Sequence, residues 1–167
     1  DAAVAGMLKQ KAAFESVLRK YGYDGALYPS KHTIITEINI PRKAYRDFIG
    51  SEAAQVNFMM KALVTAQMND ILQIHIYNLA DAKSPEKATD EFDYMGLFRN
   101  IDGVKPFDAV PNAVATAYRT TSKLLRGSKY DAALTKALRL PKSAGGGAFK
   151  NKKGKITLVL WAKTTTD

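Results

Sequence analysis

Residues 32–37 read HTIITE and residues 71–77 read ILQIHIY, and these two segments decide the fold. The first is short, β-branched and mostly apolar, which predicts a strand buried on both faces, as in a parallel sheet. The second alternates between two kinds of side chain, which predicts a strand with two different faces. Its aliphatic face consists of Leu72, Ile74 and Ile76, and its polar face consists of Gln73, His75 and Tyr77.

A helix is predicted between these two strands. Ser51 is a good N-cap, Glu52 suits the first turn, and apolar residues then recur at helical spacing to about Met68. A strand, a crossover helix and another strand make a right-handed βαβ unit with a parallel sheet. In a barrel, the polar face of 71–77 would line the interior near the mouth and the aliphatic face would meet the helices.

Further helices are predicted on both sides of this unit. The earlier one ends near Tyr21, before the stop signals Gly22 and Gly25, and its apolar stripe contains Phe14, Val17, Leu18 and Tyr21. The later one follows a long connection over 78–107, which includes a short helix or strand around 92–98. We expect Asp108 to cap it, Pro111 to lie in its first turn, and its stripe to contain Val110, Val114, Ala117, Tyr118, Thr121 and Leu125.

The composition changes after Gly127. Residues 130–140 fit either a strand or a short helix, and residues 141–147 are predicted to form a loop. Two antiparallel strands are then expected, over 148–150 and 155–164, joined by the hairpin signal Asn151-Lys152-Lys153-Gly154. This small β-region is too short to close a core by itself.

Length and composition exclude several classes of protein. With 167 residues, the chain is shorter than the roughly 250 residues of a complete (β/α)₈ barrel. The absence of cysteine excludes disulfides, thiolate metal sites and cysteine nucleophiles. His75 has no metal-ligand spacing to His32, so neither a metal nor another cofactor is expected. No apolar run approaches the ~20 residues that span a bilayer, and the chain starts at Asp1 within a helical pattern, so we expect a processed or trimmed product.

The net charge of +9 is distributed unevenly. Residues 119–155 contain eleven Lys or Arg and one acid, Asp131. One interpretation is binding of nucleic acid or another polyanion, and the other is a solvated basic face. Because no aromatic series is interleaved with the cations, we do not expect a nucleic-acid partner.

Glu37 is the residue most suited to chemistry. It ends the first strand and precedes a long βα connection, which in a parallel barrel is the face where active sites are built. A carboxylate there serves as a nucleophile or general base when a second carboxyl group lies opposite it. The alternative role for a single Glu at a strand end is that of a salt-bridge partner.

Several segments resemble clan A glycoside hydrolases. Thr36-Glu37-Ile38-Asn39 is similar to the end of their seventh strand, which carries the nucleophile, and the spacing to residues 73–79 is similar to that of their seventh helix and eighth strand. Met95-Gly96-Leu97 followed by residues 105–109, KPFDA, resembles the segment that leads into their eighth helix. Residues 158–162, LVLWA, resemble a strand of the β-sandwich that follows some of these barrels, including relatives of the family 39 xylosidases and iduronidases.

The resemblance implies an α/β fold: the C-terminal portion of a (β/α)₈ barrel over 1–127, followed by part of a β-sandwich domain over 128–167. Glu37 would be the catalytic nucleophile and Tyr77 a wall of the sugar subsite. Asn39 would help to shape the cleft, and His75 would be an interior hydrogen-bonding residue near the substrate rather than a base. The implied partners are a carbohydrate substrate and the rest of the barrel, placed upstream or in another chain, and the expected location is secreted or at the cell surface.

The sequence departs from the family in one important respect. The family's acid/base is a Glu after an Asn at the end of the fourth strand, and no such pair precedes Glu37. A retaining mechanism needs two carboxyl groups about 5–5.5 Å apart, so Glu37 alone does not complete it. The second hypothesis is therefore a non-catalytic carbohydrate-binding or cell-surface assembly module that keeps the barrel geometry.

Overall fold

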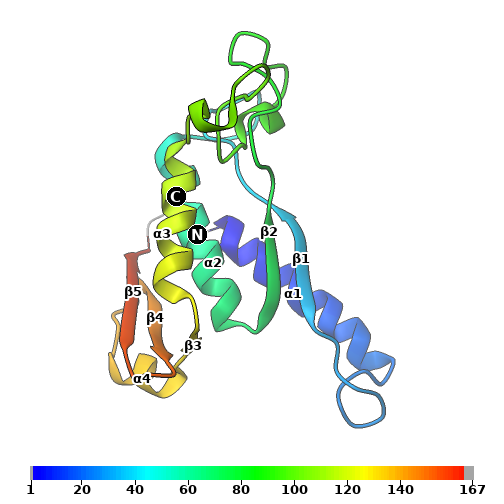
Figure 1. The fold of residues 1–167 in the computed structure, drawn as a ribbon. Coiled ribbons are helices and arrows are strands. Elements are labelled where there is room, and N and C mark those ends of the chain that lie inside the picture. The colour runs from blue at the N-terminus through cyan, green and yellow to red at the C-terminus, as the bar shows by residue number, and fades with distance from the viewer. Residues whose placement is uncertain (1, 164–167) are drawn as a thin grey trace.

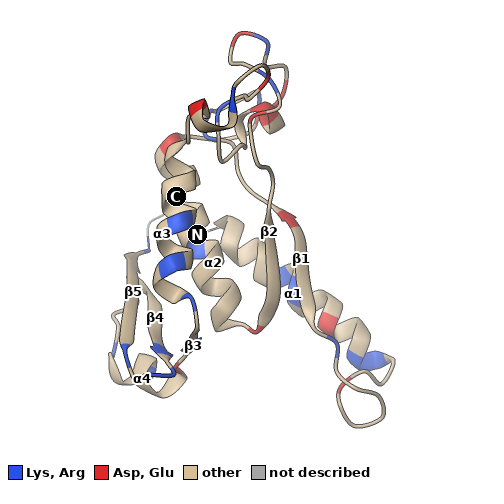
Figure 2. Cartoon of the chain, in the orientation of Figure 1, with Lys and Arg blue, Asp and Glu red and all other residues tan. Residues whose placement is uncertain are grey.

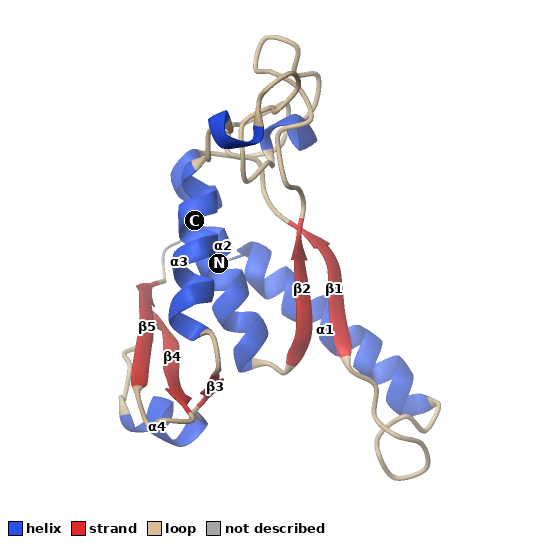
Figure 3. Cartoon of the chain, in the orientation of Figure 1, coloured by secondary structure: helices blue, strands red, loops and turns tan. Residues whose placement is uncertain are grey.

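A computed structural model describes residues 2–163 (Figure 1). Within these residues the chain is a mixed α/β protein with two small sheets and no closed barrel, so the α/β prediction is confirmed at this level (Figure 3). The helices and strands are α1 Ala2–Lys20, β1 Thr33–Ile38, α2 Glu52–Met68, β2 Ile71–Ile76, α3 Ala113–Leu125, β3 Ser128–Tyr130, α4 Ala132–Ala137, β4 Ala144–Asn151 and β5 Ile156–Ala162. Two short 3-10 helices, η1 Glu91–Tyr94 and η2 Pro106–Asp108, lie in the long connection.

The central unit is the one predicted: β1 and β2 pair in parallel, and α2 connects them. The Ser51 hydroxyl accepts a hydrogen bond from Ala54 N at 3.0 Å, which confirms the predicted N-cap. Helices α1 and α2 bury one face of the sheet. The core there contains Val4, Met7, Phe58, Ala62, Ala66 and Ile71, with Ile35, Ile38 and Ile74 packed against it.

The prediction that β1 is buried on both faces is wrong for the described chain. Ile34 is 48% exposed, and Thr36 and Glu37 are also exposed. Leu72, which was expected to face the helices, is 58% exposed, and Ile71 is buried in its place. The physical reason is that α1 and α2 cover a single face of the two strands, so the opposite face has no layer upon it.

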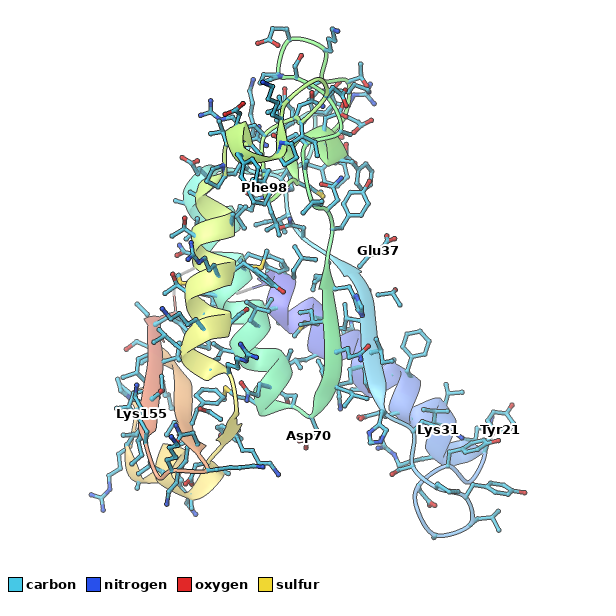
Figure 4. The ribbon with its side chains drawn as sticks, in the orientation of Figure 1. Tyr21, Lys31, Glu37, Asp70, Phe98 and Lys155 are labelled. Carbon is cyan, nitrogen blue, oxygen red and sulfur yellow. The ribbon has the colours of Figure 1, made fainter. Side chains whose placement is uncertain are left out.

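The apolar stripe predicted for the first helix is also not a core stripe. Val4 and Met7 are buried, whereas Phe14 is 73% exposed and Val17 and Tyr21 are exposed as well. Figure 1 shows the reason: the second half of α1 runs past the lower end of β1, and within residues 2–163 the loop over 21–32 is what lies beside it there. Figure 4 shows Tyr21 at that far end of the helix.

The start of α3 differs from the prediction. Asp108 ends η2 instead of capping α3, and Asn112 occupies the N-cap position. Pro111 therefore lies before the helix, and Val110 is exposed. In the rest of the stripe Val114, Ala117, Thr121 and Leu125 are buried, as predicted, and Tyr118 is half-buried.

The second sheet is antiparallel, with the strand order β3-β4-β5. Of the two alternatives for residues 130–140, the short helix is the one observed, as α4, while β3 only ends at Tyr130. The loop predicted over 141–147 is wrong, because β4 already starts at Ala144. Thr164, the expected end of the last strand, lies outside the described residues.

The glycine run in β4 is explained by packing. Gly145 pairs with Trp161, and a Cβ at Gly145 would lie 2.6 Å from the indole Nε1. At Gly146, where φ is +116°, a Cβ would lie 1.9 Å from the carbonyl oxygen of Val159. These glycines therefore belong to a tightly packed strand. The loop prediction failed here because it treated glycine as a loop signal.

This sheet packs against the helices of the first unit. Val64 of α2, Leu125 of α3 and Phe149 of β4 form one buried cluster. Met68, Tyr130, Val159 and Trp161 pack around it. Residues on both sides of position 127 thus share a core.

Candidate functional site

The predicted site residues lie where β1 and β2 end, below the long connection (Figure 1). Two of them come from β1 or the residue after it, Glu37 and Asn39, and two from β2 or the residue after it, His75 and Tyr77. Carboxyl ends of neighbouring parallel strands meet at one edge of a sheet, and here the structure brings these two strand ends together.

Glu37 lies in an irregularity of β1. Ile35 pairs with Ile74 and Ile38 pairs with Ile76, so three steps along β1 correspond to two steps along β2. Thr36 and Glu37 are therefore both opposite His75. Such a bulge redirects a side chain out of the regular alternation of a strand and is common beside active sites.

The Glu37 carboxylate is exposed and makes no hydrogen bond or ion pair with any residue that the structure describes. Figure 4 shows its side chain projecting from the upper end of β1. Glu37 also lines a hollow of about 440 Å³ beside β1, whose far wall is formed by residues of α1 that include Gln10 and Phe14. It is the only carboxylate among the described residues that line this hollow.

Asn39 connects three parts of the backbone. Its Nδ2 donates to the carbonyl oxygens of Tyr77 and Met95, both at 2.6 Å, and its Oδ1 accepts from Ile40 N at 2.9 Å. Both polar atoms of the Asn39 side chain are therefore hydrogen-bonded to main-chain groups. Asn39 shapes the edge of the site by holding the end of β1 to the end of β2 and to the long connection.

Tyr77 is half-buried, and its ring meets the ring of Phe92 edge to face, with centroids 5.8 Å apart and an interplanar angle of 80°. The peptide bond from Tyr77 to Asn78 is cis. Phe92 is half-exposed and belongs to η1. Phe92 was not among the predicted site residues, although an aromatic residue in a long connection after a parallel strand is a signal of a binding role.

His75 is exposed on the sheet face that the helices do not cover. Its Nε2 lies 3.4 Å from the Oε1 of Gln73, the preceding residue on the same face. The side chain has no carboxylate partner among the residues from 2 to 163.

A buried polar network, missed from the sequence, fixes the long connection above the site. Asp81 is buried and accepts from Arg42 Nη1 at 2.6 Å and from Gly96 N at 3.0 Å. Asn112 Nδ2 lies 3.4 Å from the other Asp81 oxygen. A Cβ at Gly96 would lie 2.0 Å from Asp81 N, so this close approach requires glycine.

A second buried carboxylate, Asp93, organises η1. Burial by itself would raise the pKa of Asp93, but hydrogen bonds from Thr89 N and Asp90 N, together with Lys83, hold it below the ordinary value. Asp93 Oδ2 accepts from Thr89 N at 2.7 Å and lies 3.2 Å from Lys83 Nζ. The connection that carries Phe92 is therefore held by charge-assisted hydrogen bonds.

Across the described residues, no group of three or more His, Asp or Glu side chains is placed to hold a metal ion. Between residues 2 and 163, no helix combines the length and the apolar character needed to cross a membrane. No family model matches the chain, and no curated protein matches it.

Proposed function

We propose that this chain is the C-terminal part of a retaining glycoside hydrolase that cleaves O-glycosyl bonds of poly- or oligosaccharides. The observation that carries the proposal is the position of Glu37, an unpaired carboxylate in a bulge at the carboxyl end of a parallel strand. Tyr77, at the end of the neighbouring strand, supplies an aromatic surface with an edge-to-face partner in Phe92. Aromatic rings of this kind suit the apolar faces of sugars.

In the proposed reaction Glu37 is the nucleophile. One of its oxygens attacks the anomeric carbon, while an acid on another part of the enzyme protonates the leaving oxygen, so the glycosidic bond breaks and a glycosyl ester forms. The deprotonated acid then removes a proton from water. That water attacks the anomeric carbon and releases Glu37 with the hydrolysed sugar.

The proposal requires a second carboxyl group and the rest of a (β/α)₈ barrel, supplied upstream in the same polypeptide or by another chain. Three features support such a partner. β1 pairs only with β2 among the described strands, so its outer edge is available for another strand. Phe14 and Ile34, beside that edge, are exposed apolar side chains in the 440 Å³ hollow. The Asn78 Oδ1 is buried without a hydrogen-bond partner among the described residues, and such acceptors normally find a donor.

The antiparallel sheet supports the proposal of a β-sandwich after the barrel. Its inner face packs on α2 and α3 through Phe149, Val159 and Trp161. Its outer face carries Ile156, Leu158 and Leu160, which are all about half-exposed. An apolar outer face is typical of a sheet that packs against a second sheet.

The test is Glu37→Gln in the complete enzyme, with the remaining barrel present. We expect turnover to fall by roughly 10³-fold or more while the circular dichroism spectrum stays unchanged, because the amide does not form the glycosyl ester. Glu86→Gln, in an exposed part of the long connection, is the matched control and should keep full activity.

A covalent probe tests the assignment of Glu37 without a measurement of turnover. A 2-deoxy-2-fluoro glycoside that accumulates the glycosyl ester should label the peptide that contains Glu37, as read by mass spectrometry. Unchanged hydrolysis in Glu37→Gln, or a label on another carboxylate, would remove the assignment.

The second candidate is a non-catalytic carbohydrate-binding or cell-surface assembly module. The observation that favours it is that Glu37 has no second carboxylate beside it in the hollow within the described residues. In that case the complete protein should bind oligosaccharides without releasing reducing ends. Either function implies a secreted or cell-surface protein, which fractionation of cells and medium with an antibody would test.

A further inference from the structure

The antiparallel end of the molecule carries a strongly basic surface, defined here as the Lys and Arg residues between positions 119 and 155. None of these side chains forms an ion pair with a carboxylate among the described residues. The acid of this segment, Asp131, caps α4 by accepting from Leu134 N at 2.8 Å. The members of the surface are Arg119, Lys123, Arg126, Lys129, Lys136, Arg139, Lys142, Lys150, Lys152, Lys153 and Lys155.

The fold places these cations on the end of α3 and on the antiparallel sheet that follows it. Arg119, Lys123 and Arg126 are spaced by four and three residues, so they lie on one face at the end of α3. Gly127, with φ +72°, then turns the chain into β3. Figure 2 shows Lys and Arg along α3 and around the lower end of the small sheet, with few Asp or Glu residues nearby. Figure 4 shows Lys155 at that sheet.

Two lysines of the basic surface are placed directly opposite each other. Lys129 of β3 pairs with Lys150 of β4 in the antiparallel register, so their exposed side chains share one face of the sheet. Like charges in this position destabilise a sheet. Neither lysine forms an ion pair with a carboxylate of the described residues.

This lysine pair borders a hollow of about 540 Å³. Lys152 contributes a third cation, and Tyr130 and Asn151 add polar groups to the same hollow. Asp131 also lines it, so three lysines face one carboxylate, and that carboxylate already accepts a hydrogen bond from Leu134 N. It belongs to the antiparallel sheet, whereas Glu37 belongs to the parallel sheet. The repulsion between the lysines and the available volume both point to an anionic ligand.

We propose that this hollow and the cations of α3 bind an acidic polysaccharide, a linear glycan that carries a carboxylate or sulfate on successive sugars. The carbohydrate part of the inference rests on the proposed function, and the acidic part rests on the basic surface. Anionic groups along the glycan neutralise Lys129, Lys150 and Lys152, which removes the repulsion within the sheet. The site would retain a charged polymer at a place separate from the bond that is cleaved.

The side chains favour a glycan over a nucleic acid. The basic surface has eight Lys and three Arg, which suit carboxylate, sulfate and phosphate alike, so the distinction rests on aromatic groups. Proteins that bind single-stranded nucleic acid combine cations with aromatic rings on which bases stack. In this hollow the aromatic residue is Tyr130, whose ring already packs against Phe149 at a centroid distance of 5.8 Å.

The experiment compares two double variants of the full chain. Lys129→Gln/Lys150→Gln removes the opposed pair, and Lys9→Gln/Lys20→Gln removes two exposed lysines from α1. Both variants lower the net charge by two, so a difference between them reports position and not total charge. The probes are polygalacturonate, uncharged xylan and a single-stranded DNA oligonucleotide, with dissociation constants measured by titration calorimetry at several salt concentrations.

We expect the unmodified chain to bind polygalacturonate with an affinity that falls as salt is raised. The β3–β4 double variant should bind about 5- to 30-fold more weakly, and the α1 variant should bind like the unmodified chain. Equal losses in both variants, absent binding, or tighter binding of DNA than of polygalacturonate at the same salt would overturn the inference.

Glu37→Gln separates this inference from the proposed hydrolase. The substitution should leave the affinity for polygalacturonate unchanged, because Glu37 lies on the other sheet. Lost hydrolysis with retained binding supports both proposals. Retained binding in a complete protein without hydrolytic activity would overturn the hydrolase alone, and hydrolysis without salt-sensitive binding would overturn the polysaccharide site alone.

Discussion

The two sheets of this protein share a helix but differ in what their free faces offer. Both use α2 for their inner faces, the parallel sheet through Phe58 and the antiparallel sheet through Val64. The free face of the parallel sheet carries the exposed Ile34 and, beside it and toward the strand ends, the polar side chains of Thr36, Gln73 and His75. The free face of the antiparallel sheet carries an aliphatic row on β5, Ile156, Leu158 and Leu160, with Lys150 and Lys129 beside it on β4 and β3.

This difference indicates different uses of the two faces. Polar side chains at the carboxyl ends of parallel strands are suited to a ligand cleft, since they provide hydrogen-bonding groups without needing to be buried. A row of half-exposed aliphatic side chains is suited to packing, because it gains free energy only when water is removed from it. The first sheet is therefore where we place chemistry. On the second sheet we place assembly on the aliphatic row of β5, and the anionic ligand at the β3 edge with Lys129 and Lys150.

The strongest test of this comparison contrasts the inner and outer faces of the antiparallel sheet. Phe149→Ala should lower the free energy of unfolding by about 3–5 kcal/mol, because the ring is fully buried between the sheet and the helices. Leu158→Ala, on the outer face, should cost about 1 kcal/mol or less in the 167-residue chain. Urea titration followed by tryptophan fluorescence would measure both. A loss of 3 kcal/mol or more for Leu158→Ala would show that another layer covers the outer face.

A smaller effect is expected in the connection above the parallel sheet. Asp81→Asn should destabilise the protein by about 1.5–3 kcal/mol, because Arg42 would lose a charge-assisted hydrogen bond in a mostly buried position. Asp102→Asn, an exposed residue of the same connection, is the control and should be nearly neutral. Thermal unfolding by calorimetry measures the difference. Equal behaviour of the two variants would mean that the network does not hold the connection in place.

The smallest effect concerns the paired lysines. Lys129→Glu places opposite charges across β3 and β4, which should raise the free energy of unfolding by about 0.2–1 kcal/mol at low salt. The gain should diminish as salt screens the pair. Lys153→Glu, in the turn after β4, makes the same charge change without an opposite partner in the ladder. A stabilisation as large for Lys153→Glu would contradict the importance of the pair.

The sequence was informative where local signals are strong. The crossover unit followed from β-branched runs on both sides of a capped helix, and Ser51 acts as that cap in the structure. It was less informative where the signal depends on packing partners. Asn112 and not Asp108 occupies the N-cap position of α3, without a side-chain capping hydrogen bond, because Asp108 is the last residue of η2. The glycines of β4 resembled a loop because their requirement comes from Trp161 and Val159 on the opposite strand.

For the candidate site, the strand-end position of Glu37 followed from the sequence, but its surroundings did not. The occupation of the Asn39 amide by two carbonyl oxygens depends on Met95, far away along the chain. The role of Phe92 depends on η1, which Asp93 holds through buried hydrogen bonds. Such long-range contacts leave no periodic pattern in the sequence.

The sequence by itself determined the order of the helices and strands as far as α3, the charge of the 119–155 segment and the presence of a carboxylate at the end of a strand, because each of these depends on neighbouring residues alone. Only the tertiary structure decided which faces are covered, that a bulge places Glu37 opposite His75, and that Lys129 and Lys150 oppose each other. These features depend on register between separate strands. A shift of one residue in either sheet would move the side chain to the other face while the sequence stayed the same.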